Sequence, residues 1–161
     1  MKRESEHFIK APCQATQRHA SLMPATSARL MHPRDFAVNR TWLAFRVNQI
    51  RLSTSDGEFD IFVLQDAGSM FLFGNALACH GAECPSKEAV AVLLKQAWSH
   101  QQQWPDELVL PGRPSRGNTF ASVAREKDIA VRAVAEARMS FYIKDVQSSL
   151  EEYARRDDEI G

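Results

Sequence analysis

The sequence predicts an α/β domain in which a three-stranded antiparallel meander precedes alternating helices and strands, in the order β-β-β-α-β-α-β-α. Residues 41–78 alternate between apolar and polar positions and contain two turn sequences, as expected for half-buried strands. Residues 86–98 change to a helical period. The later chain alternates short apolar runs with helical stripes, and a length of 161 residues suits a single domain.

The meander is expected from three apolar stretches separated by turns. Its first strand spans residues 41–52 and leads into Asp56-Gly57, a dipeptide that is typical of hairpins. The second and third strands are residues 59–64 and 69–78. Because both connections are short, we expect the three strands to pair antiparallel.

Three helices are expected in the second half of the chain. Ser86 is a suitable N-cap for the first, whose apolar stripe runs from Val90 to Trp98. Asn118 or Thr119 can cap the second helix. The last helix ends at Arg156, and the strands between the helices are residues 107–111 and 129–135.

The chain divides into three predicted regions: a flexible or loosely packed arm at 1–38, a single α/β domain at 39–156 and an acidic tail at 157–161. Residues 7–34 contain no acidic side chain and no persistent periodicity, a composition similar to that of an organellar transit peptide. Glu4 and Glu6 argue against such a leader. A translation start at Met23 or Met31 stays open.

Composition excludes several protein classes. The 20 Lys and Arg residues balance the 20 Asp and Glu residues, with basic excess in residues 1–58 and 113–140 and acidic excess elsewhere. No apolar stretch approaches about 18 residues, so we expect no membrane span. Three cysteines at irregular spacing favour a reducing compartment, and we expect a cytoplasmic bacterial protein.

The order of elements over residues 40–155 resembles the ribonuclease H-like architecture, in which a three-stranded meander precedes alternating helices and parallel strands. The segments FDIFVLQDAGS, DELVLPGRP and IAVRAVAE are similar to pieces of an uncharacterised bacterial domain family. Both resemblances concern the fold, and a fold does not by itself define a function.

Active ribonuclease H-like enzymes imply converging carboxylates that hold two divalent cations, one on the first strand and another after the fourth. The first strand of this chain has no acid and carries Arg46, and Asp106 and Glu107 lie at the opposite end of the fourth. The metal-ligand candidates are therefore carboxylates of the second strand and the last helix: Asp60, Asp66, Glu151 and Glu152. Metal-dependent phosphodiester hydrolysis is the weakest of the functions we consider.

The segment GRPSRGNT at residues 112–119 matches the G-x4-G-x-[ST] frame of a phosphate-binding loop between a strand and a helix. Asn118 replaces the lysine of that motif. The candidate residues for binding a phosphate or another anion are Arg113, Arg116, Asn118 and Thr119. We prefer the interpretation of an ordinary strand-to-helix loop, and a phosphate or nucleic-acid backbone contact is the alternative.

Cys79, His80, Glu83 and Cys84 carry zinc-binding side chains, but the sequence offers no second ligand pair at suitable spacing. We therefore predict a loop with two reduced cysteines, and no cofactor. The main functional hypothesis is a non-catalytic interaction domain that self-associates as a homodimer. The alternative is a nucleic-acid or nucleotide-phosphate binder that uses the loop at residues 112–119.

Overall fold

The computed structural model describes residues 29–160, and the remainder of the predicted arm, residues 1–28, lies outside them. The strands are β1 (Thr41–Thr54), β2 (Gly57–Asp66), β3 (Leu72–Cys79), β4 (Glu107–Pro111) and β5 (Ala130–Val134). The α-helices are α2 (Lys87–Gln101), α3 (Thr119–Glu126) and α4 (Ser140–Ile160), and two short 3-10 helices are η1 (Pro33–Asp35) and η2 (Glu136–Met139). The predicted α/β class and element order are confirmed.

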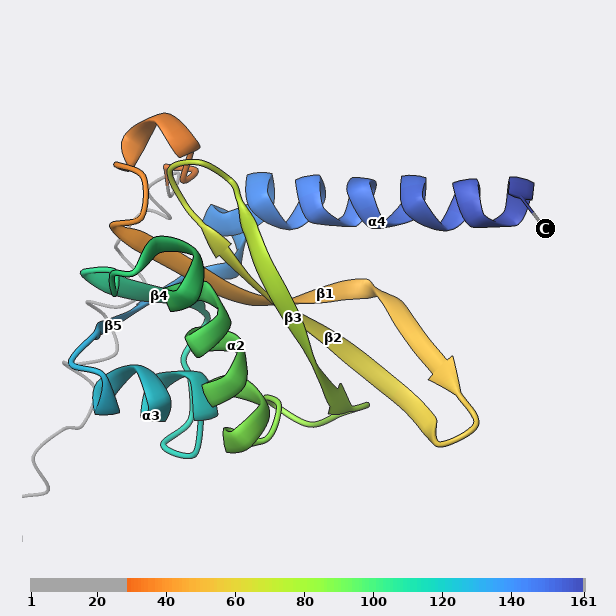
Figure 1. The fold of residues 1–161 in the computed structure, drawn as a ribbon, viewed down its shortest axis with the longest axis horizontal. Helices are drawn as coiled ribbons and strands as arrows, with labels where there is room; N and C mark the ends of the chain where they lie inside the picture. Colours follow the sequence, from red (N-terminus) through yellow and green to blue (C-terminus); the bar gives the residue numbers. More distant parts are fainter. Residues whose placement is uncertain (1–28, 161) are drawn as a thin grey trace, which may run out of the picture.

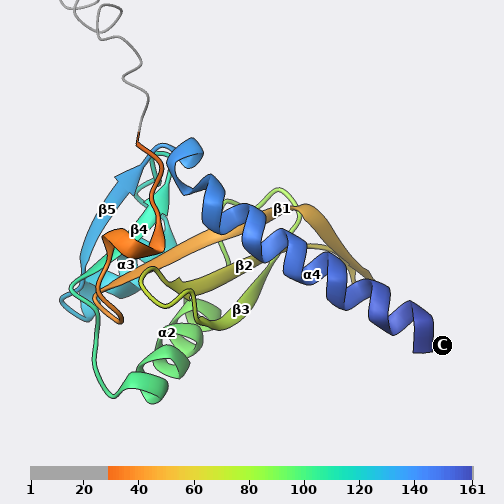
Figure 2. The same ribbon diagram turned by 90° about the horizontal axis from the view of Figure 1, so that it is seen from above.

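The five strands form one mixed sheet in the order β3-β2-β1-β4-β5. β1, β2 and β3 pair antiparallel, whereas β4 and β5 are parallel to β1. Figures 1 and 2 show α2 and α3 on one face of this sheet and α4 on the other. The parallel strands need crossover helices, which is why helices appear only after β3.

β1 is the central strand and is buried on both faces. Trp42 and Ala44 face α2 and α3, while Leu43 and Phe45 face α4, and none of the four is more than 2% exposed. The same alternation continues on β2. Two separate apolar cores therefore lie on the two sides of a single sheet, as expected for a strand order with helices on both faces.

Hydrogen-bonded caps set the boundaries of the helices. The Ser86 side chain accepts a hydrogen bond from the Ala89 N–H, as its N-cap position predicts. Asn118 caps α3 by accepting from the Ala121 N–H at 3.1 Å. β3 begins later than expected because Asp66 closes a tight turn, in which its backbone carbonyl accepts from the Met70 N–H.

The described part of the predicted arm, residues 29–38, packs against the domain. Met31 is 3% exposed in the core below α4, and its N–H donates to the Arg138 carbonyl. Asn39, at the start of the predicted domain, donates through its N–H to Asp66 and accepts from the Trp42 indole. Packing therefore begins before the boundary drawn from the sequence.

α4 is anchored only along its first half. Tyr142 is fully buried and donates its hydroxyl hydrogen bond to the Ala67 carbonyl, and Val146 is buried one turn later. Residues 151–156 are all exposed, and the helix continues to Ile160, beyond the predicted end at Arg156. Figure 1 shows this second half projecting beyond the sheet. No helix within residues 29–160 is both long and apolar enough to cross a membrane.

We predict that Gly68→Ala destabilises the fold by about 1–3 kcal/mol, because overpacking forces neighbouring groups to move. A Cβ at Gly68 would lie 2.8 Å from backbone atoms of Ala37 and Val38, which have little freedom to retreat. Chemical denaturation checks the free energy of unfolding. Gly117→Ala is the matched control, since its Cβ would approach only the Ser115 Oγ at 3.8 Å. Equal stability of the two variants would contradict the prediction.

Candidate functional site

A pocket of about 280 Å³ opens where β1 and β4 separate. The two strands pair only from Thr41 and Glu107 to Leu43 and Val109. Beyond that point β1 continues beside β2, and β4 remains with β5. The carboxyl ends of diverging parallel strands are the usual place for a ligand site in an open α/β sheet.

The pocket has an apolar floor and a charged rim. Its floor is formed by side chains from β1, β2, β4 and the adjoining helices: Ala44, Phe45, Phe62, Leu110, Phe120 and Ile143. Its charged residues are Arg46, Glu83, Arg113 and Glu136, two of each sign. A ligand for this site would therefore combine an apolar body with polar groups at its edge.

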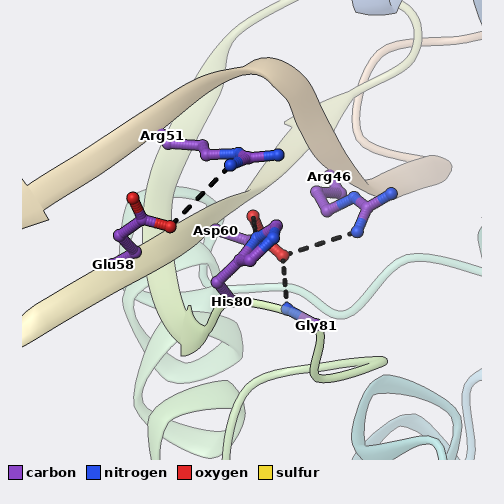
Figure 3. Close-up of polar contacts among 6 residues, drawn as sticks. All are labelled: Arg46, Arg51, Glu58, Asp60, His80 and Gly81. Atoms are coloured by element: carbon purple, nitrogen blue, oxygen red, sulfur yellow. Dashed lines mark hydrogen bonds and ion pairs between the residues drawn. The ribbon is translucent and has the colours of Figure 1, made fainter.

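Arg46 joins the pocket to a row of polar side chains across three strands. Arg46, Asp60 and His80 continue the same face of β1, β2 and β3 that buries Trp42, Leu64 and Ala76 further along. Figure 3 shows these three side chains converging, with the exposed pair Arg51 and Glu58 beside them on the hairpin. The row begins where the apolar core on this face ends.

Asp60 is the centre of this row. Its carboxylate lies 3.0 Å from His80 Nδ1, accepts from the Gly81 N–H at 3.3 Å and lies 3.4 Å from Arg46. The side chain is 8% exposed, whereas His80 and Arg46 are about half-exposed. The hydrogen bond from His80 holds the pKa of Asp60 below its ordinary value, with smaller contributions from Gly81 and Arg46, and outweighs the opposing effect of burial. Asp60 therefore stays ionised and fixes the orientation of the His80 ring.

The predicted phosphate loop already holds an internal anion. Glu83 accepts from the Ser115 N–H at 2.8 Å, and hydrogen bonds from Ser115 and Asn118 lower the pKa of this carboxyl group. Thr119 is also engaged, since its N–H donates to the Cys84 sulfur and its hydroxyl to the Pro85 carbonyl. Asn118 and Thr119 thus bind groups of α3 and of the neighbouring loop.

Arg113 and Arg116 differ from the rest of that loop. Both side chains are exposed, and within the described residues neither makes an ion pair or a side-chain hydrogen bond. Arg113 lines the pocket. These two guanidinium groups remain available to an anionic ligand.

We compared the chain with known proteins to identify its fold. No protein-family model and no curated protein sequence matches this chain. Among solved structures, 81% of this chain matches 44% of a chain of the simian T-cell lymphotropic virus intasome, solved in complex with PP2A regulatory subunit B56 gamma, at 13% identity and a TM-score of 0.54. The chain has the ribonuclease H-like fold that its order of elements predicts.

Two further matches are forms of the HTLV-2 integrase catalytic core domain in complex with magnesium. The trimeric form gives 13% identity over 77% of this chain and 71% of that chain, with a TM-score of 0.46. The dimeric form gives 16% identity over 68% and 66%, with a TM-score of 0.40. This chain spans less than half the length of the intasome chain.

The ribonuclease H-like fold does not bring the candidate metal ligands together here. Asp66 lies six positions along β2 from Asp60, a separation of roughly 20 Å in an extended strand. Its carboxylate accepts from the Asn39 N–H and from both the N–H and hydroxyl of Ser69, so it closes the β2–β3 turn. Glu151 and Glu152 lie on the exposed half of α4, across the sheet from Asp60. Within residues 29–160 no group of three His, Cys, Asp or Glu side chains could hold a metal ion.

The side chains of Cys79, His80 and Cys84 also lie in three different environments. Cys79 is exposed at the end of β3, Cys84 faces the start of α3, and His80 faces Asp60. Both cysteines are free thiols. These positions fit the predicted loop with reduced cysteines.

The sequence did not indicate that Glu136 lines the site, that Glu83 pairs with Ser115, or that His80 pairs with Asp60. The alternation of side chains along a strand could have indicated part of the row. It places Arg46 on the same face of the sheet as Trp42, and His80 on the same face as Ala78. No local pattern marks Glu83, whose partner Ser115 lies 32 residues away.

We predict that Asp60→Asn destabilises the protein by about 1–3 kcal/mol near neutral pH, because it removes a charged acceptor from His80, Gly81 and Arg46. A carboxyl group whose pKa is lowered by folding contributes stability above its ordinary pKa and loses that contribution as the pH falls through the lowered value. The difference between the wild type and Asp60→Asn should therefore shrink as the pH falls below about 4. Urea denaturation across pH measures it.

Asp56→Asn is the control, because Asp56 is exposed in the hairpin turn and asparagine also suits that turn. It should change stability little at any pH. A pH-independent difference between Asp60→Asn and the wild type would contradict the role assigned to the Asp60 charge.

Proposed function

We propose that this chain is a non-catalytic interaction domain on a ribonuclease H-like fold, and that it self-associates as a homodimer through the face of the sheet that carries α4. One observation carries the proposal: α4 covers only part of this face. Its buried residues share a core with side chains of β1, β4 and Val63 of β2, whereas β3, at the edge of the sheet, retains exposed apolar side chains on the same side.

Four exposed apolar side chains lie on the α4 side of the molecule. Leu77 pairs with Ile61 on the α4 side of the sheet and is 41% exposed, and Leu72 is 40% exposed nearby. Leu52 is 39% exposed at the β1–β2 hairpin, opposite Phe59. Tyr153, on the stripe that buries Val146, is 67% exposed. We take these side chains as the apolar part of the proposed interaction surface.

The charges of α4 suit a second copy of the chain. Glu151 and Glu152 precede Tyr153, and Arg155 and Arg156 follow it. Glu152 and Arg156 form an exposed ion pair within the helix. In a two-fold symmetric contact between antiparallel helices, each glutamate pair also faces the arginine pair of the other copy. Such a self-complementary patch is what an isologous dimer requires.

The residues on β1 and after β4, beside the pocket, favour a binding role over two-metal chemistry. β1 carries Arg46 where the ribonuclease H-like resemblance implies a carboxylate, and β4 is followed by Gly112, Arg113 and Pro114. Asp60, the nearest acid on this face, is engaged with Arg46, His80 and Gly81. A cation would have to compete with these partners for a single carboxylate.

We expect the wild type to show twice its monomer mass by size-exclusion chromatography with light scattering at micromolar concentration, and Tyr153→Asp or Leu77→Asp to shift it to monomer. A carboxylate buried at an apolar contact costs several kcal/mol unless it is paired, so the dissociation constant should rise at least about tenfold. Val38→Asp is the control, since Val38 is 60% exposed but lies before β1. A wild type that stays monomeric would remove the self-association proposal.

A second candidate function is binding of a nucleic acid or nucleotide phosphate, which the unpaired Arg113 and Arg116 favour. Contacts to phosphates release counterions, so affinity must fall as salt concentration rises. These arginines lie beside the pocket, where a polynucleotide backbone could reach the strand ends.

For this candidate, Arg113→Ala combined with Arg116→Ala should weaken binding of single-stranded DNA and flatten the logarithmic salt dependence by roughly 1.4, the loss of two phosphate contacts. Fluorescence anisotropy with labelled oligonucleotides measures both quantities. Arg34→Ala, an exposed arginine on η1, should leave them unchanged. An unchanged salt dependence in the double variant would exclude these arginines from the interface.

A further inference from the structure

A second pocket, of about 500 Å³, lies on the outer side of α2, away from the site at the strand ends. It is lined by Ala91, Val92, Lys95, Trp98, Trp104 and Lys127. α2 contributes four of these residues, and Trp104 and Lys127 close the other side from the segment before β4 and the turn after α3.

The lining is apolar where an exposed helix face is normally polar. Val92 is 58% exposed, although the inward face of α2 already buries Val90, Leu93, Leu94 and Ala97. Trp98 and Trp104 are half-buried, with ring centroids 6.2 Å apart and planes inclined by 36°. Two tilted indoles and a valine thus form a concave apolar surface that is open to solvent.

Both charged residues of the pocket are lysines. Lys95 stands on α2 one turn after Val92, and Lys127 lies with its Nζ 5.7 Å from the centre of the Trp104 ring. Neither lysine makes an ion pair within residues 29–160. The pocket therefore presents an apolar floor between two positive charges, which is complementary to a carboxylate-bearing ligand with an apolar centre.

We propose that this pocket docks a short acidic segment of a partner protein, which inserts one aliphatic or aromatic side chain against Val92, Trp98 and Trp104 and places flanking carboxylates at Lys95 and Lys127. Buried aromatic anchors surrounded by charged rims are the usual anatomy of such contacts. This contact lies on the opposite side of the sheet from the proposed dimer surface, and the two are independent.

The geometry favours an acidic peptide over a nucleic acid. Lys127 already occupies one face of the Trp104 ring, which takes that face away from a stacking base. A bound nucleic-acid strand also needs basic groups that follow its backbone, whereas this pocket has one lysine on each side. In an acidic peptide, the central side chain contacts the concave floor while the flanking carboxylates contact both lysines.

The test is a titration of the full chain with a short synthetic peptide of aspartates and glutamates around one central isoleucine, followed by tryptophan fluorescence. The peptide contains no tryptophan, so the signal comes from the protein. We expect saturable binding at micromolar concentration that weakens with added salt. A peptide with lysines in place of the acidic residues, and one with serine in place of the isoleucine, should each bind at least about tenfold more weakly.

Variants locate the binding. Lys95→Glu combined with Lys127→Glu, and separately Val92→Asp, should each weaken binding of the acidic peptide about tenfold or more, and all these positions are exposed, so folding should persist. Lys144→Glu, an exposed charge reversal on α4, is the control and should bind like the wild type. Circular dichroism verifies the fold of each variant. Unchanged affinity in the pocket variants, or tighter binding of a single-stranded oligonucleotide at the same lysines, would overturn the proposal.

Discussion

One carboxylate connects β1, β4 and β5, the three strands that form the parallel half of the sheet. Glu107 on β4 accepts from the Thr41 hydroxyl on β1 at 3.2 Å and from Arg132 on β5 through two hydrogen bonds of 3.0 and 2.9 Å. The bonds from Arg132 hold the pKa of Glu107 below its ordinary value, so the clamp carries a full charge at neutral pH. It acts at the end of β4 opposite the pocket. The strands are thus fixed where they meet and can diverge where the pocket opens.

The divergence explains why polar groups collect at this end of the sheet. Once β1 leaves β4, its side chains lose an apolar neighbour on that side, and Arg46 extends toward solvent and Asp60. Asp60 is nearly buried there, and its contacts with His80, Gly81 and Arg46 offset the cost of that burial. Similarity to an intasome chain supplies the fold, while the chemistry of this edge belongs to the residues of this chain.

The order and type of the elements could be predicted because their signals are local. Ser86 and Asn118 mark their helices by side-chain type alone, and the apolar period distinguishes strands from helices. The site could not be assembled in the same way. Irregular pairing between Arg46 and Arg51 shifts the β1–β2 register, so no count of residues places Arg46 beside Asp60. The distance between the Asp60 and Asp66 carboxylates likewise depends on β2 being extended between them, and Glu83 reaches its loop only through the tertiary fold.

The two halves of α4 are stabilised in different ways. The first is held by burial of Tyr142, Ile143 and Val146, but residues 151–156 contribute no buried surface of their own. A helical segment of that length is unstable in isolation, because nucleation costs more than a few propagated hydrogen bonds return. The second half therefore keeps its helical form by propagation from the first, and its backbone amides should exchange with solvent far faster than those near Tyr142. Slow amide exchange in this half would thus report directly that another surface covers it.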